Sequence, residues 1–238
     1  MKLDAMRAAC SKCNLRELCL PMGLTDADLK HIDRLVGARR SLRRGDALFC
    51  AGEPFESIFA VRSGFFKTRV SVDDGRERVT GFQMAGELLG LDGISDERHT
   101  CDAIALEDSE VCVIGYSCLE EISRDVAGLQ RQFHRVLSRE IVREQGVMLL
   151  LGGVRAEARL AAFLLNLGER LRSRGFSGSS MVLRMTREEI GSYLGIKLET
   201  VSRAFSRFQE EALLEVRQRN VRVVDEAGLR RLAYETQG

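Results

Sequence analysis

Three cysteines stand close together near the start of the chain, in the stretch CSKCNLRELC that runs from Cys10 through Cys13 to Cys19. In a reducing compartment, clustered thiols more often bind metal or carry out redox chemistry than form disulfides. With a fourth thiolate, they could hold a 4Fe–4S cluster or one tetrahedral zinc ion, and the spacing does not choose between the two. The N-terminal segment is therefore a candidate metal site.

A second candidate site lies in the last sixty residues. Residues 186–194 read as a short helix that opens with a capping box made by Thr186 and Glu189. The turn Gly195-Ile-Lys follows, and residues 198–209 form a second, amphipathic helix. This pattern is the signature of a helix-turn-helix motif, which binds DNA.

The second helix of this motif presents two different faces. Its apolar residues recur on one face and are expected to pack inward: Val201, Phe205 and Phe208. Glu199, Ser202 and Arg203 lie at positions i, i+3 and i+4 and share the other face. Arginine can bond a guanine bidentately while glutamate accepts from the paired cytosine. We therefore expect these three side chains to read base edges.

The alternating stretch at residues 216–224 predicts a hairpin after the recognition helix. Its arginines are expected to contact DNA phosphates: Arg217, Arg219 and Arg222. The whole chain has a net charge of only +1, so attraction to nucleic acid has to come from such a local basic surface.

Composition and length set the frame in which these sites must sit. The chain has 238 residues, of which 45% are hydrophobic and 30% are charged, as in an ordinary soluble protein of two domains. The opening residues MKLDAMR carry charges where a signal peptide needs an apolar core. The longest apolar stretch, at residues 147–151, is far shorter than the ~20 residues that span a bilayer. We expect a cytoplasmic protein without a membrane partner.

The elements between the two sites change in character along the chain. A short helix is expected at residues 24–36, and short β-rich runs begin at about residue 47. These runs are 57–62, 65–72, 78–84, 104–106 and 111–116, with an Asp74-Gly75 hairpin turn between the second and third. Several short strands at this spacing indicate a β-sandwich or a β-roll.

A long helical pattern starts at about Ser117 and ends at Gly152-Gly153, before a further helix at residues 156–173. Its seam is close to a heptad repeat and runs through Phe133, Leu137, Ile141, Glu144, Met148 and Leu151. Such a seam packs either on its own domain or against a second copy of the helix. Glu144 is the one acid in this seam.

These motifs together resemble the cyclic-AMP receptor protein superfamily. The likeness is carried by Ser63-Gly64, by Gly86-Glu-Leu-Leu-Gly90, by the long helix and by Glu199-Thr-Val-Ser-Arg203. The Cys-x2-Cys-x5-Cys spacing, with one distant cysteine at Cys112, is similar to the fumarate and nitrate reduction regulator (FNR) family within it. The resemblance implies an α+β protein with four parts: a cluster-binding segment at 1–22, a β-roll (double-stranded β-helix or jelly roll) sensor domain at 23–116, a dimerisation helix at 117–152 and a winged helix-turn-helix domain at 153–238.

The same resemblance implies an oxygen-responsive transcriptional regulator, activator or repressor, and not an enzyme. Its cofactor would be an oxygen-labile 4Fe–4S cluster on Cys10, Cys13, Cys19 and Cys112. It would act as a homodimer on TTGAT-type palindromes, contact RNA polymerase, and control anaerobic gene expression. The dimer contacts would be Leu137, Ile141, Glu144, Met148 and Leu151, with Glu144 opposing dimerisation when the cluster is absent.

Several residues depart from these patterns or leave an alternative open. Cys118 is a second candidate for the fourth ligand, whereas Cys50 and Cys101 are expected to be buried thiols. Lys197 precedes the recognition helix and cannot cap it, so either the cap comes from elsewhere or Lys197 contacts a DNA phosphate. Leu198 suits a thymine methyl group.

The function also has alternatives. Cyclic-nucleotide binders carry an arginine followed by Ser or Thr, but here Arg98 stands one place before His99-Thr100-Cys101, so no cyclic nucleotide is expected. A haem- or nitric-oxide-sensing member of the superfamily is one rival, although the three histidines lie in no haem motif. An iron–sulfur or zinc redox component is another, but the chain lacks Gly-x-Gly-x-x-Gly and any catalytic triad.

Overall fold

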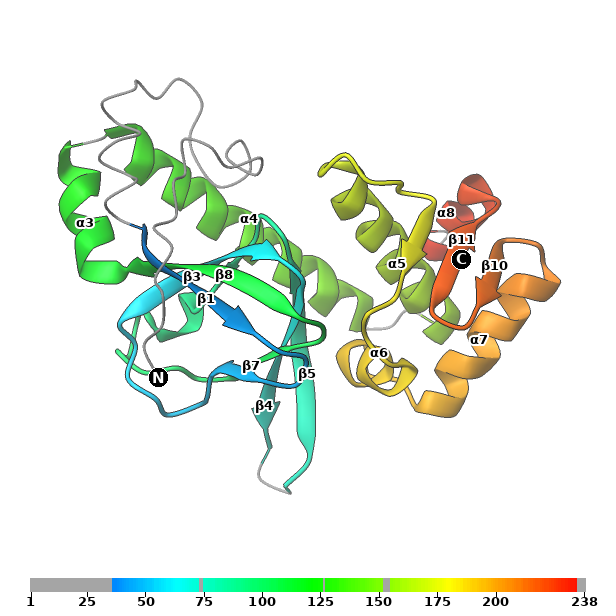
Figure 1. Cartoon of the computed structure of the whole chain (residues 1–238). Helices are drawn as coiled ribbons and strands as arrows, with labels where there is room; N and C mark the ends of the chain where they lie inside the picture. Colours follow the sequence, from blue (N-terminus) through cyan, green and yellow to red (C-terminus); the bar gives the residue numbers. More distant parts are fainter. Residues whose placement is uncertain (1–35, 73–74, 126, 152–154, 235–238) are drawn as a thin grey trace. The chain divides into compact units, whose positions relative to one another are not determined.

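A computed structural model describes residues 36–72, 75–125, 127–151 and 155–234 (Figure 1). Within it the chain divides into two compact units, with the boundary between Glu140 and Ile141. Three features of the sequence analysis lie outside the described residues: the N-terminal cysteines, residues 24–35 of the expected first helix, and the expected helix break at Gly152-Gly153. Each unit is described by itself below.

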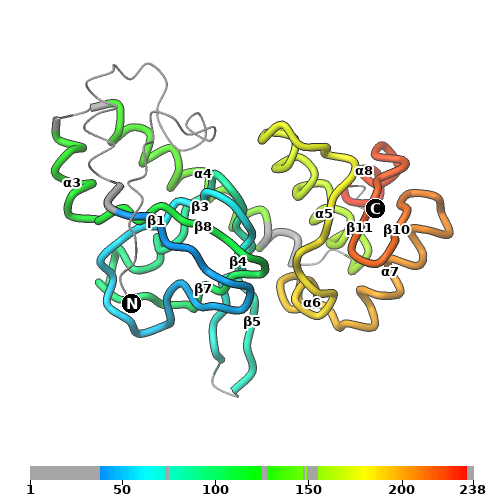
Figure 2. Tube along the Cα trace, in the orientation of Figure 1, coloured from blue at the N-terminus to red at the C-terminus, as the bar shows by residue number. Residues whose placement is uncertain are grey.

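The first unit is built on two antiparallel sheets of four strands. One has the order β1-β8-β3-β6, made of Val36–Leu42, Ser109–Gly115, Ser57–Ser63 and Leu88–Leu89. The other has the order β2-β7-β4-β5, made of Ala47–Phe49, Asp102–Ala105, Phe65–Ser71 and Glu77–Met84. The β4–β5 hairpin extends beyond the other strands (Figure 2). The predicted β-roll is confirmed, although β1 and β6 were not expected from the sequence.

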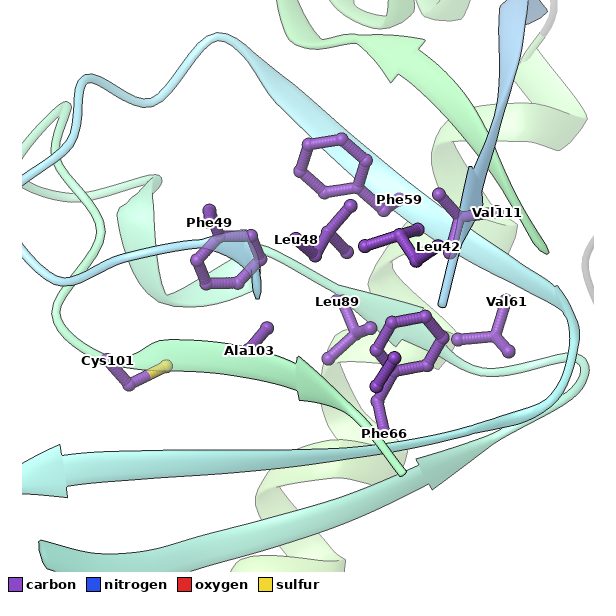
Figure 3. Close-up of a cluster of buried hydrophobic side chains, with 11 residues drawn as sticks. Leu42, Leu48, Phe49, Phe59, Val61, Phe66, Leu89, Cys101, Ala103 and Val111 are labelled. Atoms are coloured by element: carbon purple, nitrogen blue, oxygen red, sulfur yellow. The ribbon is translucent and has the colours of Figure 1, made fainter. Parts of the chain in front are cut away.

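The interior of the roll is a single apolar cluster. Figure 3 shows its side chains pointing toward one another from the two sheets: Leu42, Leu48, Phe49, Phe59, Val61, Phe66, Leu89, Cys101, Ala103 and Val111. The Ser63-Gly64 motif serves this packing, because Gly64 has a φ of 93° and a Cβ there would lie 2.0 Å from the Ser109 hydroxyl. Only glycine fits the turn that joins β3 to β4.

Two helices follow the roll where one long helix was expected: α3 (Tyr116–Asp125) and α4 (Ala127–Leu151). A second apolar cluster joins them to the first sheet through Ile58, Leu119 and Leu129, with Phe133 packed against it. At Phe133 the helical seam therefore packs on its own domain, one of the two possibilities that the sequence left open.

The second unit has four helices around a small sheet. Its helices are α5 (Ala156–Arg172), α6 (Arg187–Leu194), α7 (Leu198–Glu210) and, at the end, α8 (Glu226–Tyr234). The sheet has the order β10-β11-β9, made of Leu214–Arg217, Asn220–Val223 and Ser180–Val182. The long buried face of α5 packs against α7 and α8. This is the expected winged helix-turn-helix, with β9 and α8 in addition.

No helix in the described part of the chain is long and apolar enough to cross a membrane.

Candidate DNA-binding surface and metal centre

The helix-turn-helix is held by its first helix and by the turn. The capping box of α6 is present as predicted: the Glu189 amide donates to the Thr186 hydroxyl at 3.1 Å, and the Thr186 amide donates to the Glu189 carboxylate at 2.7 Å. Gly191 packs so tightly that a Cβ there would lie 2.6 Å from the carbonyl oxygen of Ile196 in the turn. Gly195 ends α6 with a φ of 64°. These contacts fix the angle between α6 and α7.

The two faces of α7 are separated as its sequence predicts. The apolar face is 0–1% exposed at Val201, Phe205 and Phe208. On the opposite face Glu199 and Arg203 are exposed and Ser202 is half-buried. The Arg203 guanidinium makes a long contact of 3.4 Å with the Thr200 hydroxyl, so its donors remain available to a ligand. The arrangement leaves an acceptor, a hydroxyl and a cation together on one exposed face.

The N-terminal end of α7 lacks a side-chain cap. Lys197 occupies the capping position and its side chain makes no capping hydrogen bond. The first amides of a helix attract anions when no side chain satisfies them, and Lys197 adds a positive charge beside them. Leu198, the next residue, is 44% exposed. This end of α7 therefore combines a phosphate-binding character with one apolar contact.

The hairpin of β10 and β11 places two of its three arginines at the turn. Arg217 and Arg219 are exposed on either side of Gln218, which adopts a φ of 56°. Arg222 instead forms an ion pair with Glu215 on the neighbouring strand, with Nε 3.1 Å from Oε2. The hydrogen bond from Arg222 lowers the pKa of the Glu215 carboxyl. Arg222 is thus ion-paired within the hairpin, whereas Arg217 and Arg219 lie at its exposed turn.

Cys112 is the one predicted cluster ligand that falls within the described residues. It lies on β8 between Arg39 of β1 and Ala60 of β3. Because side chains alternate along a strand and its neighbour Val111 points into the roll, Cys112 points to the outer face of the sheet. It is half-buried there. The thiol is directed away from the packed interior, as a metal ligand requires.

The surroundings of Cys112 are compatible with an anionic metal centre. The Nε atom of Arg39, directly across from it, is buried and has no hydrogen-bond acceptor among the described residues. Buried donors are nearly always hydrogen-bonded, and a water or an anionic ligand can supply the acceptor. No group of three or more metal-binding side chains occurs within residues 36–234 as far as they are described.

The other described cysteines differ from one another. Cys118, on α3, is half-buried and packs against the apolar cluster beside Ile114, so it faces the same side of the sheet as Cys112. Cys101 is buried as expected; burial raises the pKa of its thiol, which donates to Asp92 at 3.5 Å. Cys50 is exposed, and the expectation that it is buried was wrong because it follows the end of β2.

The place that an arginine occupies in cyclic-nucleotide binders is taken by a buried histidine. His99 is 4% exposed, and its ring stacks on Phe49 with centroids 3.7 Å apart. Its Nδ1 lies 3.4 Å from the carboxylate of Asp92. Arg98 is exposed and donates to the carbonyl of Gly52 at 2.6 Å. The interior here presents an aromatic stack and an acid, which do not suit a phosphate.

The predicted dimer seam on α4 is exposed where its side chains are described. Ile141 is 55% exposed and Met148 is 69% exposed, Glu144 between them is exposed, and Leu137 is half-buried. The side chain of Leu151 lies outside the described residues. A soluble surface rarely leaves such apolar residues grouped on one helix without a partner.

Arg39 is the residue of this site that the sequence did not reveal. It is 73 positions away from Cys112, and only the pairing of β1 with β8 brings the two together. No motif marks it in the sequence.

Comparisons with known proteins agree with this architecture. Residues 39–125 match the family model of the cyclic nucleotide-binding domain, and residues 158–232 match that of the Crp-like helix-turn-helix domain. The transcriptional regulatory protein btr of Bordetella pertussis is 45% identical over 94% of this chain and 93% of its own length. The transcriptional activator protein anr of Pseudomonas aeruginosa is 45% identical over 95% of this chain and 93% of its own length.

A further relative and a solved structure extend the comparison. The fumarate and nitrate reduction regulatory protein of Escherichia coli is 38% identical over 95% of this chain and 91% of its own length. The solved structure of FixK2 from Bradyrhizobium japonicum superimposes with a TM-score of 0.77 at 29% identity, over 84% of this chain and 98% of that one. Similarity therefore runs through both units of the chain.

Proposed function

We propose, from the premise that this chain belongs to the FNR family of the cyclic-AMP receptor protein superfamily, that oxygen controls its binding to DNA through a 4Fe–4S cluster. That the protein is a DNA-binding transcriptional regulator, and not an enzyme, follows from the family itself. The proposal concerns the signal, the cofactor and the DNA sequence.

The observation that carries the proposal is the position of Cys112. A structural thiol in this roll would be expected to point inward, as Cys101 does, but Cys112 points outward beside Arg39, whose Nε has no acceptor among the described residues. Cys10, Cys13 and Cys19 would supply the other three ligands. A cluster on four thiolates, when bound, supplies an oxygen-sensitive link between the N-terminal segment and the sheet. Cys118 remains the alternative fourth ligand.

The recognition surface supports a TTGAT-type palindrome as the target. Arg203 would donate to a guanine and Glu199 would accept from a cytosine; both are exposed on the same face of α7, with Ser202 between them. Lys197, Arg217 and Arg219 would bind phosphates and fix the position of α7 in the major groove. Leu198 would touch a thymine methyl group.

A homodimer is the form in which we expect DNA binding. A palindrome calls for a two-fold symmetric protein, and the exposed seam of α4 offers it a contact surface. RNA polymerase is a further proposed partner. We also propose that the protein is cytoplasmic, because its target is DNA. The buried His99 and its acidic neighbour argue against control by a cyclic nucleotide.

The experiment that tests the cofactor is anaerobic purification of the parent, of Cys112→Ser and of Cys118→Ser, with assays of iron, sulfide and zinc. The proposal expects iron and sulfide in equal amounts in the parent and in Cys118→Ser, and neither in Cys112→Ser. Serine fails because its hydroxyl does not ionise near neutral pH, whereas a coordinating thiol is deprotonated. Zinc in place of iron would refute the cluster. A full cluster in Cys112→Ser would move the fourth ligand to Cys118.

A further inference from the structure

The outer face of the β1-β8-β3-β6 sheet holds a charged group that the proposed DNA-binding function does not use. It consists of Arg39 on β1, Arg62 on β3 and Glu110 on β8. Glu110 precedes Cys112 by two positions on the same strand, so both side chains lie on the same face. The charges therefore border the proposed cluster ligand.

Glu110 does not satisfy both arginines. Its carboxylate forms a hydrogen-bonded ion pair with Arg62, whereas the nearest nitrogen of Arg39 stays 3.9 Å away, beyond hydrogen-bond distance. Of the two arginines, Arg39 is therefore the one that Glu110 does not hydrogen-bond.

Arg39 is also the member of the group that lies next to Cys112. The two residues are directly paired across β1 and β8, which places their Cβ atoms about 4.5–5.5 Å apart on one face of the sheet. The Arg39 side chain is only 19% exposed, and its buried Nε donor has no acceptor among the described residues. A buried donor of this kind is destabilising unless a ligand completes it.

Arg40, the next residue on β1, differs from Arg39 because its guanidinium is hydrogen-bonded to backbone acceptors. Arg40 points to the opposite face and donates to the carbonyl oxygens of Leu48 at 2.8 Å and Ala47 at 3.3 Å. Its role is to tie the edge of the sheet to β2. Arg39 makes no equivalent bond through its Nε within the described part of the chain.

We propose that Arg39 is a positioning residue for the metal centre: its guanidinium donates to sulfur at the Cys112 corner and balances the negative charge of the thiolate-bound cluster. This inference rests on the proposed function, because it requires a cluster at Cys112. Hydrogen bonds to cluster sulfurs and to metal ligands are known to set metal affinity and cluster properties. The guanidinium suits this task because its donors are fixed in a planar fork.

The test compares iron loss from the full-length protein, reconstituted anaerobically with iron and sulfide and then exposed to a ferrous chelator without oxygen. The rate is followed by the loss of the cluster's visible absorbance. We expect Arg39→Gln to release iron about tenfold faster than the parent, at the low end of the effect of removing a partner of a metal ligand. The matched control is Arg62→Gln, which removes the same charge from the same group but away from Cys112, and should stay within about twofold of the parent.

A second readout separates a contact with sulfur from a general loosening of the sheet. Resonance Raman spectra report the iron–sulfur stretching bands of the bound thiolates, and these should shift in Arg39→Gln but not in Arg62→Gln. Should Arg39→Gln fail to fold, Arg39→Lys replaces it; because lysine keeps the charge but lacks the Nε donor, about threefold faster release is expected.

The outcomes that would overturn the inference are distinct from those that would overturn the function. A parent that takes up no iron and sulfide refutes the cluster and the role of Arg39 together. Suppose instead that the parent holds a full cluster and that Arg39→Gln matches it in both the rate of iron release and the resonance Raman spectrum. That result refutes the role of Arg39 and leaves the cluster intact. Equal acceleration in Arg39→Gln and Arg62→Gln would also refute it, since any charge in the group would then suffice.

Discussion

Replacing Glu144 by alanine should allow the metal-free protein to dimerise. Glu144 is exposed on α4 between Ile141 and Met148, which are 55% and 69% exposed. In a two-fold dimer formed by this face, each seam residue meets its own copy, so the two Glu144 carboxylates lie close together. We propose that this repulsion keeps the apo protein monomeric and that cluster binding overcomes it.

The size of the effect follows from the geometry of the seam. Two carboxylates about 6 Å apart at an effective dielectric constant of about 20 repel by about 3 kcal/mol, and solvent screening at a partly exposed seam reduces this to about 1–3 kcal/mol. The dimer dissociation constant of Glu144→Ala should therefore fall by about 5- to 150-fold.

The opposite change is expected when an apolar seam residue is truncated. About half of the Ile141 surface is still exposed, so a partner can bury roughly half of the ~1.5–3 kcal/mol that full burial of isoleucine is worth. Two copies together lose about 2 kcal/mol in Ile141→Ala, which weakens the dimer about 30-fold. This loss should appear even when the cluster is present.

Sedimentation velocity of the metal-free proteins over a range of concentrations measures both changes. Gln145→Ala is the matched control, because this exposed neighbour of Glu144 lies outside the seam and should behave as the parent does. If Glu144→Ala sediments as a monomer at every concentration where the parent is monomeric, Glu144 faces only water and the proposed repulsion does not exist.

Three further predictions concern the DNA-binding unit and the helices. Arg203→Ala should lose about 1–3 kcal/mol of discrimination at the guanine of the half-site, measured by competition with single-base variants, and unchanged selectivity would contradict the assignment of α7. Arg219→Ala should weaken all sequences alike and reduce the slope of log affinity against log salt by about 1. Gly191→Ala should destabilise the winged-helix unit by more than about 1 kcal/mol in chemical denaturation, because its Cβ would meet the Ile196 carbonyl at 2.6 Å. Gly146→Ala, whose Cβ would have nothing within 4 Å, should instead stabilise α4 by up to about 1 kcal/mol. Equal effects at the two glycines would show that packing is not the cause.

Local patterns were sufficient to predict the helix-turn-helix. The capping box at Thr186 and Glu189 and the apolar spacing of α7 are both short-range signals, and the structure has both. The strands β3, β4, β5 and β8 were also found because each carries its own run of β-forming residues.

Elements that depend on distant partners could not be predicted in this way. β1 contains glycine and two arginines, a poor strand sequence by itself, and it forms because it pairs with β8 some seventy residues later. α3 and α4 were predicted as one helix because the helical pattern continues from one to the other. Phe133 satisfies both the heptad spacing and the local cluster that it joins.

The same limit applies to the candidate metal centre. Spacing marked the three N-terminal cysteines, and the family resemblance added Cys112, but the outward direction of Cys112 depends on the register of β8 between β1 and β3. The position of Arg39 beside Cys112 depends on the pairing of β1 with β8 and on no local sequence signal. The ion pair between Arg222 and Glu215 likewise depends on the register of β10 and β11.

The central claim is that a 4Fe–4S cluster switches this regulator on for DNA binding. The measurement that tests it most directly is fluorescence anisotropy of a labelled TTGAT palindrome, titrated with one protein preparation before and after brief exposure to air, at fixed salt. We predict that loss of the cluster weakens binding at least tenfold, which corresponds to about 1.4 kcal/mol, and that a scrambled site of the same length shows no such change. Equal affinity of the cluster-bound and air-exposed protein for the palindrome would contradict the account.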